Sequence, residues 1–336
     1  MTISRRGFAT LAGLGLSSLP LRGLRAQGGE SIVVYNAQHA SLTKAWVAAF
    51  TRETGIAVTQ RDGGDVELAN QIVQEGSASP ADVFLTENSP AMALVEGAGL
   101  FAPLDPATLA LVPQRFRPST GRWIGIAARS TVLAYDTRRL TPAQLPSSLM
   151  DLADPAWKGR WGAAPAGADF QAIVSAMLQL KGEAATLAWL RGMKQNVVTF
   201  RGNSVAMKAV NAGQVESAVI YHYYFAGDRA RTGENSNNLA LHYFRHQDPG
   251  AFLSISGGGV LAPSKRRTQA EAFLRWIAGP AGQQVLRDNS FEYPVAAGTP
   301  ANPALKPMEE LQAPAIDPST LNSKAVVALM TQAGLL

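Results

Sequence analysis

Short apolar runs alternate in the first half of the chain with stretches whose apolar residues recur every three or four positions. The runs occupy residues 31–35, 56–59 and 81–85, and the periodic stretches occupy residues 41–55, 66–76 and 92–97. Short apolar runs are typical of buried strands, and the longer period is typical of amphipathic helices. This order predicts a parallel sheet with helices on both faces, in which ligands bind at the carboxyl ends of the strands.

A second α/β pattern follows a long β-rich segment, residues 122–136. It contains a predicted helix near 171–182, a strand in 215–225 that feeds a helix, and an amphipathic helix over 268–286. Residues 254–262 are a second candidate for a long strand. We expect the two long strands to cross between two α/β lobes, which would leave a cleft that closes by hinge motion.

The two crossing strands divide the mature chain into two predicted lobes. We assign residues 27–128 plus 256–300 to the first lobe, and residues 129–255 plus 301–336 to the second. The fold class predicted from the pattern is therefore α/β, with two lobes joined by two crossing hinge strands around a central cleft.

The first 26 residues are typical of an export signal. Arg5 and Arg6 precede an apolar stretch over 8–21, and Ala26 offers a cleavage site, which is the arrangement of a twin-arginine signal. The apolar stretch is too short, and too interrupted by glycine, serine and proline, for a membrane anchor. We expect a cleaved signal and a mature protein located in the periplasm.

Charge and composition exclude several classes of function. The 336 residues carry 30 basic and 25 acidic side chains, a formal charge of +5. Four of the arginines lie in residues 1–26, which have no acidic residue, so cleavage leaves 26 basic against 25 acidic residues, or +1. This balance argues against a nucleic-acid partner. The absence of cysteine excludes disulfide scaffolds, thiolate metal sites and a cysteine nucleophile.

The candidate chemistry lies where predicted strands end. His39 follows the first strand, Glu87 follows the third, and Tyr223 and Tyr224 are placed at the end of the strand in the second lobe. Because the carboxyl ends of parallel strands meet at one edge, an imidazole, a carboxylate and two phenols are expected to converge across the cleft. Each of them alone is compatible with an ordinary packing or capping role.

Two further histidines could in principle form a metal site. His242 and His246 stand four residues apart, but residues 239–244 alternate like a strand, which would separate their side chains. We therefore expect two surface histidines rather than a metal site.

The four converging residues would favour a particular ion. Three of them donate anionic oxygen and none donates soft sulfur, which selects hard cations. A phenol has a pKa of about 10, so it binds at neutral pH only when a strongly polarising ion replaces its proton. Two phenolates and one carboxylate match the charge of Fe(III), and acid should then release the metal. An octahedral ion would need two further donors.

At these residues the sequence resembles the periplasmic ferric-iron-binding proteins of bacterial ABC importers. The resemblance covers nearly the whole mature chain. The runs that carry it are VYNAQH (34–39), TGIAV (54–58), SPADVFLTEN (79–88), YDTRRL (135–140), PAWKGRWG (155–162), KGEAA (181–185), GNSVAM (202–207), HYYF (222–225), HQDPGA (246–251), SGGGVL (256–261) and EYPV (292–295).

The resemblance implies a fold, a ligand set and a role. It implies the periplasmic-binding-protein-like fold of two α/β lobes, with His39, Glu87, Tyr223 and Tyr224 as the iron ligands. It also implies that the protein takes up Fe(III) with a synergistic anion, carbonate or phosphate. Its partners would be an inner-membrane permease and the ATPase of that importer, and we expect a monomer.

The anion site departs from the best-known pattern of the family. In place of a Ser-Gly-Ala turn this chain has Ala166-Gly167-Ala168, so the serine hydroxyl is missing. Asn203 is kept, whereas Tyr221 stands where a second asparagine is common. Other members bind carbonate through an arginine of the first crossing strand, and Arg129 would act so here, or would form a salt bridge at the hinge.

Two other functions stay open at this point. One is a receptor for an organic solute on the same scaffold, which would show no metal-dependent colour. The other is a secreted metal-dependent enzyme, which needs an open coordination position and an activated base or water. No additional histidine or carboxylate is clearly placed for such a base, and the expected protein is not an enzyme.

Overall fold

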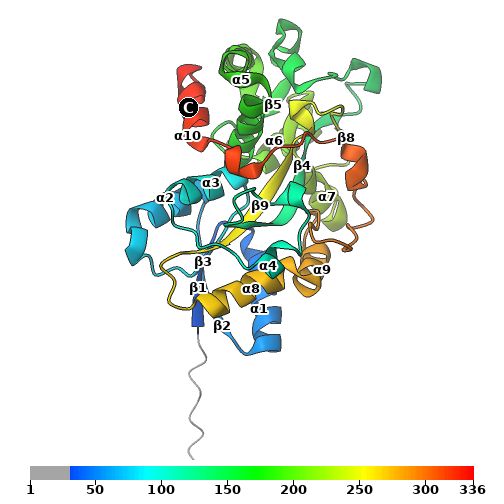
Figure 1. Ribbon diagram of the computed structural model, residues 1–336. Coiled ribbons are helices and arrows are strands. Elements are labelled where there is room, and N and C mark those ends of the chain that lie inside the picture. The colour runs from blue at the N-terminus through cyan, green and yellow to red at the C-terminus, as the bar shows by residue number, and fades with distance from the viewer. Residues whose placement is uncertain (1–30) are drawn as a thin grey trace, which may run out of the picture.

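The computed structural model describes residues 31–336. The predicted export signal, residues 1–26, lies outside the described residues. Figure 1 shows two lobes, one above the other, with two strands running from one into the other. Over residues 31–336, no helix has both the length and the apolar character needed to cross a membrane.

The first lobe has the predicted alternation of strands and helices. Its sheet places β1 between β2 and β3, with both pairs parallel. Helices cover the sheet (Figure 1). The elements are β1 (Ser31–Asn36), α1 (Ala40–Thr54), β2 (Ala57–Asp62), α2 (Asp65–Glu75), β3 (Val83–Leu85), α3 (Ser89–Gly97) and α4 (Pro106–Leu109).

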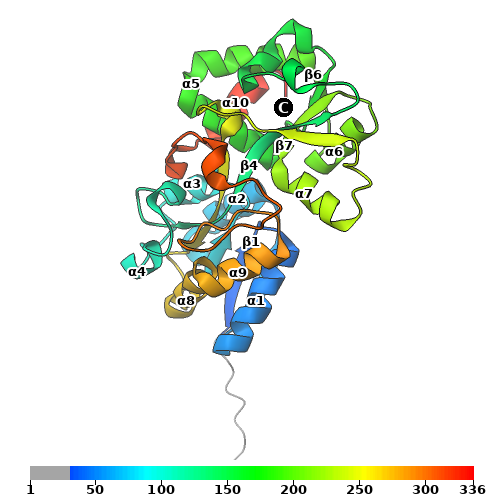
Figure 2. The ribbon, with the colours of Figure 1, turned by 90° about the vertical axis from the view of Figure 1, so that its right-hand side faces the viewer.

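Both long strands exist and run between the lobes. They are β4 (Ile124–Asp136) and β9 (Leu253–Val260), and they pair antiparallel. β9 also pairs with β3 of the first lobe, whereas β4 pairs from Thr131 onward with β7 (Ser217–Tyr221) of the second lobe. The sheet order β2-β1-β3-β9-β4-β7-β5-β6 therefore passes through both lobes, as Figures 1 and 2 show.

The second lobe is also α/β. Its parallel strands β5, β6 and β7 are joined by helices, and β8 pairs with β4. Its elements are β5 (Trp161–Ala163), α5 (Ala168–Asn196), β6 (Val197–Thr199), α6 (Asn203–Asn211), β7 (Ser217–Tyr221), α7 (His222–Arg231), β8 (Leu239–His242) and α10 (Ser323–Gln332). The strand predicted around His242 is confirmed by β8. Helix α5 runs beyond its predicted end, across a kink at Gly182, whose φ is 78°.

The single helix predicted over 268–286 is wrong. Two helices occupy this stretch, α8 (Arg267–Ala278) and α9 (Pro280–Asn289). Gly279 between them is extended, with φ −84° and ψ 174°. A proline disfavours helical backbone at the residue before it, and it is itself well placed in the first turn of a helix, so Pro280 ends one helix and begins the next.

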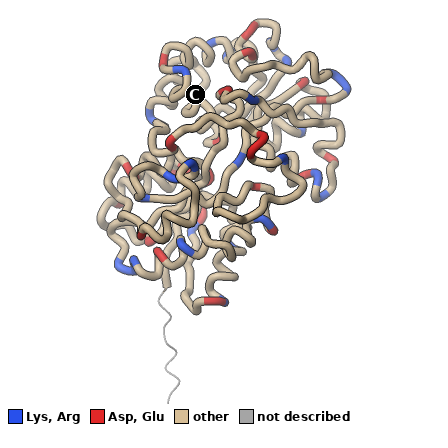
Figure 3. The backbone as a smooth tube through the Cα atoms, turned by 45° about the vertical axis from the view of Figure 1, so that its right-hand side comes forward, with Lys and Arg blue, Asp and Glu red and all other residues tan. Residues whose placement is uncertain are grey.

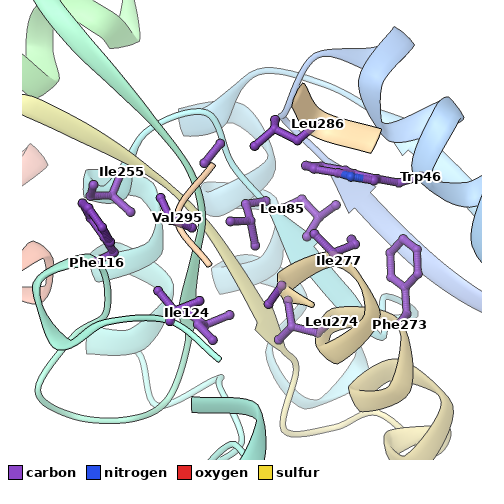
Figure 4. Close-up of a cluster of buried hydrophobic side chains, with 14 of the residues drawn as sticks. Trp46, Leu85, Phe116, Ile124, Ile255, Phe273, Leu274, Ile277, Leu286 and Val295 are labelled. Carbon is purple, nitrogen blue, oxygen red and sulfur yellow. The ribbon is translucent and has the colours of Figure 1, made fainter. Parts of the chain in front are cut away.

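Each lobe has its own hydrophobic core. In the first lobe, Trp46 of α1, Phe273 and Ile277 of α8 and Leu286 of α9 lie in one buried cluster (Figure 4). The Trp46 indole N–H also donates a hydrogen bond of 2.7 Å to the carbonyl of Gly282, so that its one polar atom is satisfied. In the second lobe, Trp189 and Met193 of α5 lie in one buried cluster with Leu329 and Met330 of α10.

The last segment of the chain contributes to both cores. Leu305 and Leu311 are buried in the first-lobe cluster, whereas Leu321 and Val326 are buried in the second-lobe cluster. The chain therefore passes between the lobes a third time, after β4 and β9. Charged residues of both signs are interspersed over the two lobes (Figure 3), as the near-equal counts of basic and acidic residues beyond residue 26 lead one to expect.

Gly125 tests the packing of β4 against the first lobe. A Cβ atom at this position would collide with the carbonyl oxygen of Phe116, which is backbone and cannot turn away. We expect Gly125→Ala to lower the free energy of unfolding by about 1–3 kcal/mol, measured by urea or thermal unfolding. The matched control is Gly97→Ala in α3, where a Cβ would meet nothing within 4 Å. Equal stability of the two variants would contradict this account.

Candidate functional site

The two site residues of the first lobe lie at the carboxyl ends of parallel strands, as predicted. His39 follows β1 and precedes the first residue of α1, and its backbone N–H donates 2.7 Å to the side chain of Gln38. Glu87 follows β3, and its backbone N–H donates 2.9 Å to the Asp65 carboxylate. The His39 Nδ1 and Glu87 Oε1 atoms are 2.9 Å apart.

The predicted placement of the tyrosine pair in a strand is wrong. β7 ends at Tyr221, and Tyr223 and Tyr224 belong to the first turn of α7. Neighbouring residues of a strand point to opposite faces, whereas neighbours in a helix are about 100° apart. The two phenol rings consequently stack, with centroids 4.2 Å apart and planes 29° apart, and both line one cavity. Because they lie in a helix, the two neighbouring tyrosines can face the same cavity, which neighbours in a strand could not do.

The four residues converge between the lobes. The His39 ring contacts the Tyr223 ring edge to face, with centroids 5.1 Å apart. His39, Tyr223 and Tyr224 line a cavity of about 740 Å³, and Glu87 and Tyr224 line an adjoining cavity of about 270 Å³. Residues of both lobes therefore form the walls of one cleft, with Tyr224 between its two parts.

Some polar atoms in the cleft have no hydrogen-bond partner. Among the described residues, the Tyr223 hydroxyl is buried without a hydrogen-bond partner, and His39 Nε2 faces Glu292 Oε1 at 3.5 Å, beyond a good hydrogen bond. Buried polar atoms without a partner are rare and need an explanation. The 2.9 Å between His39 Nδ1 and Glu87 Oε1 is the length of an ion-paired hydrogen bond, and two donors in adjacent positions about 2.0–2.2 Å from a metal ion can lie equally close. The donor set therefore suits a metal ion.

The tyrosines are essential to any such site. Within residues 31–336, no group of three or more His, Asp or Glu side chains is placed to hold a metal ion by itself. Burial raises the pKa of Tyr223 and of Tyr224, and the nearby Asp169 carboxylate raises both further. The phenols are thus neutral until a strongly polarising cation replaces their protons.

Arg129 is surrounded by protein carboxylates. Its side chain is fully buried, and its Nη2 atom lies 2.5 Å from Glu292 Oε2 and 2.8 Å from Ser256 Oγ. Its Nη1 atom lies 3.3 Å from Glu87 Oε2. Burial alone would lower the pKa of Arg129, but the two carboxylates raise it well above its usual range. Of the two roles considered for Arg129, this geometry corresponds to the salt bridge.

Asp169 is a site residue that the sequence analysis missed. It lies in the first turn of α5, directly after the 166–168 turn, and its Oδ2 accepts 2.7 Å from Asn203 Nδ2 and 3.1 Å from the Tyr224 hydroxyl. Its Oδ1 accepts 2.9 Å from Asn88 Nδ2. Asp169 could have been predicted from the sequence, because it directly follows the turn considered for anion binding.

The other residues considered for an anion lie around this carboxylate. Gly167, Ala168 and Asn203 line the 270 Å³ cavity together with Asp169. Ala166 is in the same turn, and its carbonyl accepts from Gln171 Nε2 at 3.2 Å. Tyr221 is fully buried, and its hydroxyl lies 3.1 Å from the Asp169 carbonyl and 3.3 Å from Asn88 Oδ1, so that its contacts are those of a packed wall residue.

Glu292 and Asp65 also escaped the sequence analysis. Glu292 is fully buried and contacts both Arg129 and His39. Asp65 is buried beside Glu87, and burial raises its pKa to about 7. Neither has a motif that signals its role from spacing alone, although Glu292 opens the EYPV run.

Several known proteins are similar to this chain in sequence and structure over almost its whole length. The "Fe(3+)-binding periplasmic protein" of Serratia marcescens is 66% identical over 312 residues, covering 93% of this chain and 92% of that protein. The "Major ferric iron-binding protein" of Neisseria meningitidis is 38% identical over 307 residues, covering 90% and 93%. The crystal structure of iron-bound HitA from Pseudomonas aeruginosa superimposes with a TM-score of 0.87 at 42% identity, covering 91% of this chain and all of that one.

These likenesses confirm the predicted two-lobe fold of periplasmic binding proteins, and they extend the resemblance noted from sequence runs. Residues 78–320 match the family described as bacterial extracellular solute-binding protein, which spans most of both lobes. The chain belongs to the bacterial extracellular solute-binding protein family.

Proposed function

We propose that the protein is a periplasmic receptor that captures Fe(III) between its lobes and delivers it to an ABC importer. The observation that carries the proposal is the convergence of His39, Glu87, Tyr223 and Tyr224 at one cleft. The names of the Serratia and Neisseria relatives, and iron-bound HitA, support it.

The chemistry of these four donors favours Fe(III) over softer or weaker cations. Glu87 and two phenolates would supply three negative charges and only oxygen atoms, while His39 adds a neutral nitrogen. Burial raises the pKa of both phenols, so an ion such as Ca²⁺ or Mg²⁺ would not displace their protons. The cavity would therefore take a small trivalent ion whose binding releases two protons.

Asp169 would be a fifth donor in this site. Its carboxylate lies beside Tyr224 and Asn203, in the place where the family resemblance implied an external anion. With this carboxylate supplied by the chain, a carbonate, a phosphate or a water molecule would fill one remaining position. The Asp169 carboxylate takes over most of the charge that a synergistic anion would bring.

The lobes would act as a clamp. Strands β4 and β9 would serve as the hinge, with the boundaries at 128/129 and 255/256, and closure would bring the tyrosines of α7 to His39 and Glu87. The closed monomer would be recognised by an inner-membrane permease with its ATPase. Export through the twin-arginine signal would place the protein in the periplasm, where it acts as a binding protein rather than an enzyme.

The tyrosine pair gives a direct test. Ferric citrate added to the metal-free protein should produce a phenolate-to-iron charge-transfer band in the visible spectrum. Tyr223→Phe and Tyr224→Phe should each lose most of this band and of the bound iron, because each removes an anionic donor. The control is Tyr35→Phe, a buried tyrosine of the first lobe whose hydroxyl bonds Glu75 at 3.0 Å. A colourless parent protein without iron by elemental analysis would overturn the proposal.

Asp169 gives a second test. Asp169→Asn should weaken Fe(III) binding by at least about tenfold, or ~1.4 kcal/mol, measured by competition with a chelator. Added phosphate or carbonate should restore much of the loss in the variant and change the parent little. The matched control is Asp136→Asn, which removes another buried carboxylate of the second lobe, paired with Arg138. Parent-like affinity in Asp169→Asn would exclude the aspartate as a donor.

A further inference from the structure

Two carboxylates contact the same two basic groups in the cleft. Glu87 reaches His39 Nδ1 at 2.9 Å with Oε1 and Arg129 Nη1 at 3.3 Å with Oε2. Glu292 faces the other atom of each group, with Oε1 3.5 Å from His39 Nε2 and Oε2 2.5 Å from Arg129 Nη2. The arrangement is a ring of four side chains in which each basic group lies between two carboxylates.

The two carboxylates differ in how firmly they are held. The Glu87 side chain is 22% exposed and lines the smaller cavity, so it has room to turn. Glu292 also lines a cavity, the larger one, but its side chain has no exposure, and the next residue is held against β4 because Tyr293 and Ala128 exchange hydrogen bonds of 2.8 and 2.9 Å. Glu87 is therefore the more accessible carboxylate of the ring, and Glu292 is the more firmly held.

This difference matters when Glu87 binds an ion. Its Oε2 would leave Arg129, whose guanidinium is fully buried. A buried charge left without a partner is strongly destabilising. If Glu87 were the sole carboxylate partner of Arg129, breaking this pair would oppose the binding of an ion by Glu87. Glu292, at 2.5 Å, already pairs with the guanidinium and remains there.

The same residue also faces the imidazole. Histidines that bind metals nearly always direct their second ring nitrogen to a carboxylate, a carbonyl or water, which sets the orientation of the ring. Glu292 Oε1 and His39 Nε2 are both buried and have no hydrogen-bond partner within the described part of the chain. Their separation of 3.5 Å closes to a hydrogen bond with a small turn of the ring.

We infer that Glu292 is a positioning residue of the iron site: it keeps Arg129 paired and orients His39, so that Glu87 is free to bind the ion. It does not itself contact the ion. The inference rests on the proposed Fe(III) site, and it assigns to a residue outside the ligand set the task of making a ligand available.

The test compares Glu292→Gln with a variant that also removes the arginine charge. Glu292→Gln leaves Arg129 dependent on Glu87, and we expect its Fe(III) affinity to fall about 10–100-fold in chelator competition. In Arg129→Met/Glu292→Gln, no arginine retains Glu87, which keeps only its contact with His39, so the affinity should return to within about tenfold of the parent. Recovery of affinity on removing a second side chain is a result that simple structural damage would not produce.

Glu216 provides the matched control for Glu292. Glu216 also bridges two arginines, Arg139 at 3.0 Å and Arg160 at 2.7 Å, and it lies just before β7, at the opposite end of that strand from Tyr221. Glu216→Gln should lower the melting temperature without changing iron affinity. Parent-like affinity in Glu292→Gln, or a folded double variant that binds no better than the single one, would overturn the inference.

Two further results are informative. If Glu292→Gln does not fold, iron binding by the double variant supports the inference, and a folded double variant without iron contradicts it. Failure of the parent protein to bind iron would refute the proposed function itself, and the parent's charge-transfer band separates that case from a failure of the Glu292 inference alone.

Discussion

The structure is organised around one buried positive charge. Arg129 lies on β4, the strand that both lobes share, and its guanidinium has no contact with water. Such a charge is tolerated only when carboxylates are brought to it. Glu87 comes to it from the end of β3, and Glu292 comes from the loop after α9. The need to neutralise this side chain therefore joins the strand edge of the first lobe to the strand that leads into the second.

The cleft divides its chemistry between the lobes. The first lobe holds an imidazole and a carboxylate that are already paired, at a separation that adjacent metal ligands also have. The second lobe holds two stacked phenols whose protons are retained because burial raises their pKa. Neither half is a complete set of donors, and the aspartate of α5 lies where the two halves meet. In the proposed function, binding and closure of the lobes would for this reason be one event.

Hydrophobic periodicity was sufficient for the strands and helices of the first lobe, and for His39 and Glu87, because both follow short strands whose ends are clear. It failed at Tyr223 and Tyr224, since aromatic residues favour strands and the apolar run continues past Tyr221. Periodicity also predicted α8 and α9 as one helix, because the amphipathic spacing continues across Gly279. Asp169 and Glu292 could not be predicted from period or spacing, because their roles arise from contacts with residues distant in the chain.

The position of the tyrosines in the first turn of α7 has an electrostatic consequence. A helix carries about half a positive charge at its amino end. His39 precedes α1, Asp169 and Asn203 lie in the first turns of α5 and α6, and the tyrosine pair lies in the first turn of α7. Four helix dipoles thus direct their positive ends toward one small volume. These amino ends partly offset the burial that raises the pKa of the two phenols, so the backbone itself would favour the anionic donors once an ion has replaced the phenolic protons.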